Sequence, residues 1–488
     1  MTEKLKISLV YLITGLFIIL NTYLVMKEFY WGILIPLGIF IVLLYLFSLD
    51  KVILIAVLTT PLAVDIGNYE LGVRISLPSE PLLIGVMLLF ILKVSLEGGL
   101  DRKFLRHPVS IAILINLLWI LVTSITSSLP LVSFKFLLAR LWFIIPLYYA
   151  GSLLFKKYSN INSFAWYYVS TLLIVICYAT YHHSLYGFSE RSGHWVMTPF
   201  YNDHTAYGAI LALFLPIIGG YAFDREAGAK LRWIAVGVAL VLAMALFLSS
   251  SRAAWVSFVF AMVVLILVLL RIRFTWILST IGFLMIIFFM FKFEILDKLE
   301  KNKQDSSANF IEHIQSISNI STDASNLERI NRWQSALRMY HEHPVLGWGP
   351  GTYQFQYAPF QRTKEKTIIS TNLGDMGNAH SEYIGPLAES GMPGMLSFLA
   401  IMVTVIYTGL RVCRRAERRQ VKILALTITL GFITYFLHGV MNNFLNTDKA
   451  SVPFWGFVAI LVAMDLYHSG KAKEEKPEVR PVEKVLEN

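Results

Sequence analysis

Apolar segments long enough to cross a membrane recur along most of this chain, and they constrain its fold more than any other feature. A spanning helix needs about 20 mostly apolar residues, and we count about fourteen candidate segments, with an uncertainty of about two. The third and fourth are short, which also fits re-entrant segments. The sequence predicts an all-α polytopic membrane protein with about 12–14 transmembrane helices. The candidate segments are 7–26, 29–48, 51–64, 80–95, 109–127, 134–155, 162–184, 203–222, 231–248, 253–271, 274–293, 394–411, 421–440 and 452–467.

The composition agrees with a membrane protein and argues against two other classes. Hydrophobic residues make up 56% of the chain and charged residues 15%, whereas a soluble domain carries roughly 25% charge. The net charge is +10, but Lys and Arg cluster at the ends of apolar segments, so no nucleic-acid partner is implied. Cys177 lies in an apolar run and Cys413 in a basic one. They provide neither a disulfide framework nor a metal site.

Lysine and arginine are unevenly distributed between the loops, and this predicts the orientation of the chain. Because short cytoplasmic loops carry the excess of positive charge, we expect the richer set of loops and both termini to be cytoplasmic. The longest polar segment then lies outside, which in a bacterium is the periplasmic side of the inner membrane. The richer loops contain Lys93, Arg102, Lys103, Arg106, Lys156, Lys157, Arg225, Lys230, Arg232, Arg271, Arg273, Arg411, Arg414, Arg415, Arg418, Arg419 and Lys422.

This long polar segment divides the chain. It is too long for a simple connection between helices, and loops of that size are usually functional or disordered. Its regular aromatic and aliphatic residues predict that it is folded. We therefore expect four parts: about eleven transmembrane helices in 1–293, a large periplasmic loop in 294–393, three more transmembrane helices in 394–467, and a disordered cytoplasmic tail in 468–488.

Within the loop, residues 327–343 show a helical pattern. Apolar residues recur there every three or four positions, which places them on one helix face. Pro344 ends the pattern, and the following sequence PVLGWGPG is rich in glycine and proline. Such a composition imposes a tight, irregular backbone. Taken alone, this stretch fits a surface turn equally well.

Three basic residues on the predicted outer side are candidates for chemistry. They are Arg191, Arg252 and His380. Two arginines can hold a pyrophosphate through bidentate, charge-assisted hydrogen bonds. A neutral histidine, with an ordinary pKa of about 6.5, can take a proton from a sugar hydroxyl. Each residue alone has a structural explanation, but the combination suits glycosyl transfer from a lipid pyrophosphate without a metal.

Other kinds of site find little support. His341 and His343 are two residues apart, and neither this pair nor the adjacent His182 and His183 has a helical ligand spacing with a carboxylate. No glycine-rich phosphate loop followed by Lys and Ser or Thr is present, which argues against a nucleotide-driven pump. Asp203-His204, at the start of an apolar segment, fits either an acceptor site or a helix cap.

Residues 190–394 resemble the O-antigen ligase and polymerase superfamily of bacterial membrane proteins. Four sets of motifs carry this resemblance, and they occur in the order that they have in the family. Each motif alone is weak, and the set is specific. The N-terminal ~130 residues, which hold the first predicted spans, contain no matching motif. The motifs are MTPFYN at 197–202, SSRAAW at 250–255, the segment from Glu328-Arg329 to Trp333 followed by PVLGWGPG at 344–351, and AHSEY at 379–383 followed by ESGMPG at 389–394.

The resemblance implies an enzyme that takes a glycan from undecaprenyl pyrophosphate in the periplasm. In the ligases the acceptor is the lipid A-core, the linkage inverts, and no metal or other cofactor is used. By this analogy His380 activates the acceptor hydroxyl, while Arg191, Arg252 and Arg329 bind the donor pyrophosphate. The remaining candidates for an acceptor or supporting role are Asp203, His204 and Glu382.

Three alternatives to a ligase remain. An O-antigen or exopolysaccharide polymerase uses the same donor but adds the glycan to another lipid-linked unit, and a protein O-oligosaccharyltransferase adds it to protein. These enzymes differ from a ligase in their acceptor. A transporter predicts charges within the middle of spanning helices and internal repeats. Here the candidate groups lie at the outer ends of the helices, which argues against transport.

Overall fold

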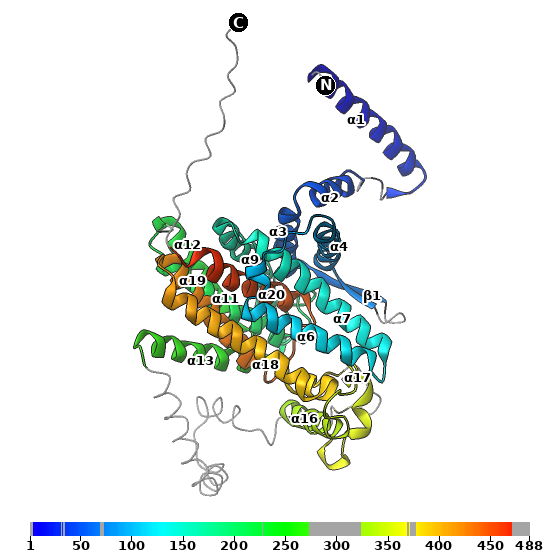
Figure 1. The fold of residues 1–488 in the computed structure, drawn as a ribbon. Coiled ribbons are helices and arrows are strands. Elements are labelled where there is room, and N and C mark those ends of the chain that lie inside the picture. Colours follow the sequence, from blue (N-terminus) through cyan, green and yellow to red (C-terminus); the bar gives the residue numbers. More distant parts are fainter. Residues whose placement is uncertain are drawn as a thin grey trace.

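The computed structural model describes residues 3–30, 32, 35–68, 73–226, 228–272, 324–367, 370 and 377–470. Within these ranges the chain is mostly helical, which confirms the predicted fold class (Figure 1). The predicted span 274–293, part of the predicted loop and most of the predicted tail lie outside the described residues. The helices are α1 (Glu3–Met26), α2 (Ile35–Phe47), α3 (Leu49–Thr59), α4 (Ser79–Glu97), α5 (Arg102–Leu105), α6 (Pro108–Ile125), α7 (Pro130–Ile144), α8 (Gly151–Leu154), α9 (Tyr158–Leu185), α10 (Glu190–Gly193), α11 (His204–Phe223), α12 (Gly228–Leu248), α13 (Arg252–Leu269), α16 (Ala324–Glu342), α17 (Tyr353–Gln356), α18 (Ile384–Arg415), α19 (Arg419–His438) and α20 (Asp448–Ala463).

Ten helical segments among the described residues are long and apolar enough to cross a membrane. They coincide with ten of the predicted spans, because continuous apolar length is a local property of the sequence. The three N-terminal predictions fall on α1, whose apolar part Thr14–Met26 is short, and on the short helices α2 and α3. The chain is therefore a multi-pass membrane protein.

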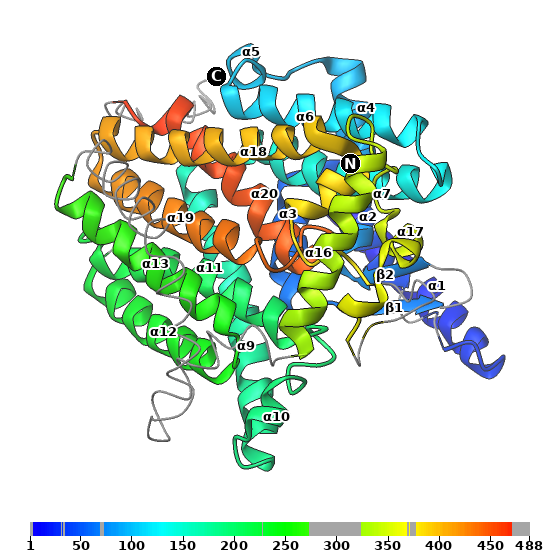
Figure 2. The same ribbon diagram turned by 90° about the horizontal axis from the view of Figure 1, so that it is seen from below.

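Burial separates a central group of helices from a lipid-facing group. The windows of α20, α11 and α19 that could span the membrane are 83%, 78% and 67% buried, whereas those of α12 and α13 are only 22% and 17% buried. Figures 1 and 2 show α12 and α13 at one side of the bundle and α20 near its centre. Because apolar side chains are exposed along α12 and α13, these helices have the surface expected of a contact with lipid.

A small β-hairpin is a feature that we did not predict. Strands β1 (Val64–Asn68) and β2 (Val73–Leu77) pair antiparallel, with Val64 opposite Leu77 and Ile66 opposite Ile75. Its first residue, Val64, is the last residue of the predicted segment 51–64. Because two five-residue strands contribute so little, the fold class stays all-α.

The folded part of the polar loop rests on the bundle through α18. The predicted loop helix is present as α16, which packs against α18 (Figure 2). Residues 384–393 form the first part of α18, and the helix is kinked where Gly391 adopts φ 68° and ψ −173°. The kink separates a short segment that carries the loop from the long segment that crosses the membrane.

The glycine- and proline-rich stretch after α16 docks into this kink and is more than a surface turn. Trp348 N–H donates to the Ala388 carbonyl at 3.1 Å, and Met392 N–H donates to the Pro344 carbonyl at 2.9 Å. On the other side of the stretch, the Ser128 hydroxyl donates to the Trp348 carbonyl at 2.8 Å. The stretch thereby ties the loop between α6 and α7 to the start of α18.

Candidate active site

His380 lies in a tight turn four residues before α18. Its backbone is left-handed, with φ 46°, a conformation that is uncommon outside glycine and clusters at functional sites. The His380 N–H donates to the Asn378 side-chain oxygen at 2.9 Å. Arg332 of α16 donates to the Asn378 carbonyl at 3.1 Å. The turn is therefore held from within by Asn378 and from outside by the loop helix.

Arg332 approaches this turn because Gly377 has no side chain. A Cβ at Gly377 would lie 1.7 Å from the Arg332 guanidinium, so any other residue would displace the cation. Arg332 is itself fixed by Glu328, which accepts from its Nε at 2.9 Å, and it stacks over the Tyr357 ring at 5.4 Å. The guanidinium thus occupies one defined position beside His380.

Glu328 is the anionic centre of this network. Its carboxylate is buried and accepts hydrogen bonds from Ser370 and Arg332 and, at 3.0 Å, from Thr367. Burial alone would raise the pKa of Glu328, but the bonds from Ser370, Arg332 and Thr367 outweigh it and hold the pKa below its ordinary value. The carboxylate therefore stays ionised and keeps Arg332 in place.

The environment of His380 favours the neutral imidazole. Burial, followed by the positive charges of Arg332 and Arg329, lowers the pKa of His380 from 6.5 to about 4. Asp203 and Glu328 act in the opposite direction but less strongly. His380, Arg329 and Asp203, three of the residues singled out in the sequence, are thus brought into one electrostatic environment. At neutral pH the ring is uncharged and can accept a proton.

Asp203 and His204 approach this site from the start of α11. Asp203 caps the helix, since its carboxylate accepts from the backbone N–H groups of Thr205 at 2.7 Å and Ala206 at 2.8 Å. The His204 ring stacks on His194 with centroids 4.2 Å apart. Asp203 is therefore a helix cap, one of the two roles that the sequence left open. Its negative charge also raises the pKa of His380.

Arg252 and Arg191 lie at the edge of the same end of the bundle. Arg252 is the first residue of α13, and a Cβ at Gly208 of α11 would lie only 2.6 Å from the Cβ of the preceding Ser251. The Arg252 guanidinium is 3.8 Å from Glu190, and both side chains are largely exposed. Arg191 follows Glu190 in α10 and is exposed. Both arginines are accessible, and Ser251, the residue before Arg252, packs against α11 one turn after His204.

Glu382 is buried and links the turn that carries His380 to neighbouring helices. One oxygen of its buried carboxylate accepts from Tyr435 at 2.9 Å, from Phe444 N–H at 2.8 Å and from Leu445 N–H at 2.9 Å. Its own N–H donates to the Gly439 carbonyl at 2.8 Å. Glu382 therefore ties the turn carrying His380 to the connection between α19 and α20.

Sequence reasoning missed two groups near the site. Arg332 is one, although its spacing of four residues from Glu328 is a recognisable helical ion pair. His438, the last residue of α19, is the other; it is buried and lies within electrostatic reach of Asp203, Arg329 and His204. No local signal distinguishes His438, because only the packing of α19 brings it there.

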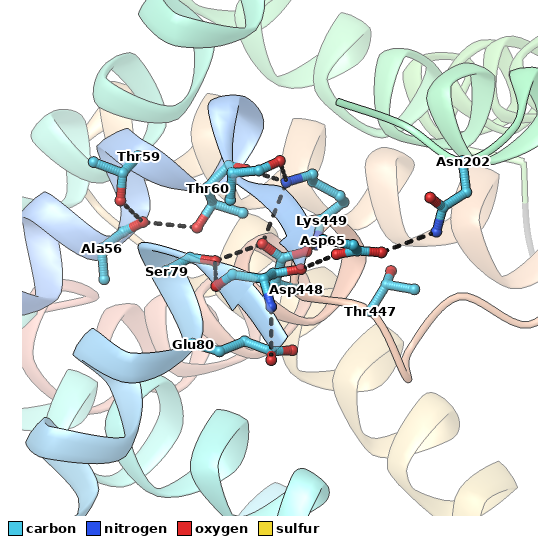
Figure 3. Close-up of polar contacts among 12 residues, drawn as sticks. Ala56, Thr59, Thr60, Asp65, Ser79, Glu80, Asn202, Thr447, Asp448 and Lys449 are labelled. Atoms are coloured by element: carbon cyan, nitrogen blue, oxygen red, sulfur yellow. Dashed lines mark hydrogen bonds and ion pairs between the residues drawn. The ribbon is translucent and has the colours of Figure 1, made fainter. Parts of the chain in front are cut away.

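A second polar cluster lies beside the site, under the β-hairpin (Figure 3). The Lys449 ammonium donates to the carbonyls of Thr60 at 2.6 Å and Ala63 at 2.7 Å and lies 3.3 Å from Asp448. Ser79 donates to Asp448 at 2.6 Å. Asn202, next to Asp203, donates to Asp65 of β1 at 3.2 Å. This cluster connects the start of α20 and the hairpin to the start of α11.

Among the residues that the structure describes, no group of three or more His, Cys, Asp or Glu side chains could hold a metal ion. The cations that face His380 are guanidinium groups. The arrangement offers a neutral base that is influenced by two arginines and two carboxylates. Such a set can deprotonate a hydroxyl and balance the charge of an anionic group.

Comparisons with known proteins support the motif analysis. Residues 237–399 match the family model described as O-antigen ligase, a range that contains Arg252, Arg329 and His380. A stretch of 167 residues is 24% identical to an uncharacterized protein of Haemophilus influenzae, covering 34% of this chain and 36% of that relative. The aligned stretch thus spans about a third of the length of the relative. The family match supports the resemblance that the motifs indicate: residues 237–399 of this multi-pass membrane protein are similar to the O-antigen ligase family, whose members are glycosyltransferase-like enzymes of glycan assembly.

Proposed function

We propose that this protein is an O-antigen ligase. It transfers a glycan from undecaprenyl pyrophosphate to a hydroxyl of the lipid A-core, at the periplasmic face of the bacterial inner membrane. The observation that carries the proposal is the position of the neutral His380 beside Arg329, Arg332 and Asp203, in a chain whose residues 237–399 match the O-antigen ligase family.

The reaction uses His380 as the general base. As the acceptor oxygen attacks the anomeric carbon, its proton passes to the imidazole, and the bond from that carbon to the pyrophosphate oxygen breaks. The pyrophosphate leaves with the electron pair, and Arg329 and Arg332 stabilise the negative charge that develops on it. Attack from the side opposite the leaving group inverts the linkage. No metal is needed, because guanidinium groups supply the positive charge.

Asp203 stabilises His380 after the ring has taken the proton. Its carboxylate acts on His380 in the direction that favours the protonated ring, so it stabilises the imidazolium that forms. Donor binding assists as well. A pyrophosphate placed between Arg329 and Arg332 cancels charges that depress the pKa of His380, and the ring regains basicity when the donor is bound.

The exposed arginines and the lipid-facing helices suit the remainder of the donor. Arg252 begins α13, and most of the apolar surface of α12 and α13 is unburied. The second phosphate of the same pyrophosphate is bound by Arg252 and Arg191, and Arg252 thereby exchanges its exposed contact with Glu190 for a stronger one. The polyprenyl chain then extends into the bilayer along α12 and α13.

Reconstitution with defined acceptors tests the proposal. The purified protein is given undecaprenyl-pyrophosphate-linked glycan with lipid A-core in one tube and donor alone in the other, and products are resolved by gel and mass spectrometry. We expect glycan on lipid A-core with wild type, loss of that product with His380→Ala, and no effect of a chelator. His341→Ala is the matched control, since His341 is exposed at the end of α16.

Two outcomes contradict the proposal in different ways. Longer lipid-linked glycans in the tube without lipid A-core, and no transfer to lipid A-core in the other, identify a polymerase. Transfer to lipid A-core that survives His380→Ala removes His380 from the role of base.

A further inference from the structure

A large pocket lies at the opposite end of the bundle from His380, among the helix ends that carry the positive charges predicted to be cytoplasmic. It holds about 650 Å³ of free space, within the range of roughly 300–1,000 Å³ that is usual for ligand pockets. The pocket is formed where α2 meets α3, by the C-terminal part of α4, and by α8 with the residues that follow it. Its lining is Tyr45, Phe47, Leu49, Asp50, Ile53, Leu89, Phe90, Leu92, Lys93, Leu96, Glu97, Ala150, Leu153, Leu154, Lys156, Lys157 and Asn160.

The inner wall of the pocket is apolar. Ile53, Phe90 and Leu154 line it and are themselves buried in the bundle. The two uncharged polar residues of the wall are already satisfied, since Tyr45 donates to the Leu82 carbonyl at 2.8 Å and Asn160 donates to the Leu154 carbonyl at 2.9 Å. The inner part of the pocket therefore accommodates a hydrocarbon chain and offers little to a polar ligand.

The rim of the pocket carries five charged residues. Lys93, Lys156 and Lys157 supply three positive charges against the two negative charges of Asp50 and Glu97, which leaves a net charge of +1. The Lys156 ammonium lies 5.5 Å from the centroid of the Tyr467 ring, so Lys93 and Lys157 are the lysines best able to turn toward a ligand. A net charge of +1 balances one phosphodiester.

We propose that this pocket binds an anionic phospholipid. The phosphate lies between Lys93 and Lys157 at the rim, and an acyl chain follows the apolar wall toward Ile53 and Phe90. Basic pockets between membrane helices on the cytoplasmic side are suited to acidic lipid head groups, and a lysine at the surface of an anionic leaflet contributes about 1 kcal/mol. The site is independent of the proposed glycan transfer, because it lies at the other end of the helices.

The test measures lipid binding to the purified full-length protein by native mass spectrometry in detergent. The probes are phosphatidylglycerol, which is anionic, and phosphatidylcholine of the same acyl composition. The test variant is Lys93→Gln with Lys157→Gln. The matched control is Lys103→Gln with Lys230→Gln, which removes two exposed lysines that do not line the pocket.

We expect wild type to retain phosphatidylglycerol in preference to phosphatidylcholine, and the test variant to bind it about tenfold more weakly, at about 1 kcal/mol per lysine with partial compensation. The control should bind as wild type does. Glu97→Gln, which raises the net charge of the rim to +2, should bind phosphatidylglycerol more tightly. All variants should show the wild-type melting temperature, because the changed side chains are exposed.

Three results would overturn the proposal. One is equal retention of both lipids by wild type. Another is an equal loss of phosphatidylglycerol in the test and control variants, which would indicate a general attraction to positive charge. The third is displacement of phosphatidylglycerol by millimolar inorganic phosphate, which would indicate a free-anion site without a role for the acyl chain.

Discussion

Gly391→Ala should destabilise the protein more than an ordinary glycine substitution, because two separate penalties meet at this position. The backbone of Gly391, with φ 68° and ψ −173°, lies in a region that is essentially restricted to glycine, and such strain costs about 1–3 kcal/mol. An added Cβ would also lie 2.1 Å from the Val345 carbonyl oxygen and 2.7 Å from that of Pro344. These are backbone atoms and cannot rotate away.

Relief of the second penalty requires the glycine-rich stretch to move away from α18. The movement breaks the 2.9 Å hydrogen bond from Met392 N–H to the Pro344 carbonyl, at a cost of about 1 kcal/mol. Strain and loss of this bond together amount to about 3 kcal/mol. Since α18 begins four residues after His380, we expect a lower rate of glycan transfer as well.

Two control substitutions separate the penalties. Gly98 has a similar φ of 69°, and no atom lies within 4 Å of a Cβ added there, so Gly98→Ala measures strain alone. Gly219 lies in α11 with ordinary helical φ and open space around it, so Gly219→Ala should cause no loss. Apparent melting temperatures in one detergent give the comparison. If Gly391→Ala loses no more stability than Gly98→Ala, the docking of the glycine-rich stretch does not constrain α18.

Three further predictions concern the site. In the free enzyme the acid limb of kcat/KM should lie near pH 4, the pKa of His380. Arg332→Gln should move this limb to higher pH. A wild-type limb near pH 6.5 would contradict the lowered pKa of His380. The pKa of His380 in the folded protein lies below the unfolded value of 6.5, so the unfolded state binds the proton first as pH falls. Melting temperatures should therefore decrease from pH 6.5 to pH 4, by an amount that reflects at most about 3 kcal/mol of unfolding free energy. The decrease should be less steep in His380→Gln. Glu382→Ala leaves Tyr435 and two backbone N–H groups unpaired and should cost about 3 kcal/mol or more, whereas Glu382→Gln, which keeps an acceptor oxygen, should retain most of the stability.

The transmembrane helices were predictable because each depends on its own apolar length. Ten predicted spans match helices of sufficient length and hydropathy, and α16 appears where the apolar periodicity placed it. The β-hairpin was missed because strands of five residues have too little periodicity to compete with a neighbouring apolar run. The docking of the glycine-rich stretch was also beyond the sequence, since its partners lie in α18 and in the loop before α7.

The sequence singles out some residues of the candidate site, but it does not indicate Arg332, His438 or the geometry of the site. His380, Arg329 and Asp203 were identified from their chemistry and from the family motifs, and only tertiary packing brings α11 to the turn before α18. The supporting role of Glu382 depends on Phe444 and Leu445, more than 60 positions away along the chain. No local pattern distinguishes such a carboxylate from one that meets a substrate.

The arginines proposed to bind the donor also influence the proposed base, His380. A ring with a pKa near 4 is a weak base, and catalysis favours a pKa close to the working pH. Burial is the largest cause of the low pKa, and Arg332 and Arg329 lower the pKa further. A bound pyrophosphate offsets the contribution of the two arginines. In the proposed mechanism His380 is therefore a stronger base when the donor is present. The acid limb of kcat, which reports the bound complex, should then lie at higher pH than that of kcat/KM, and coincident limbs would refute the coupling.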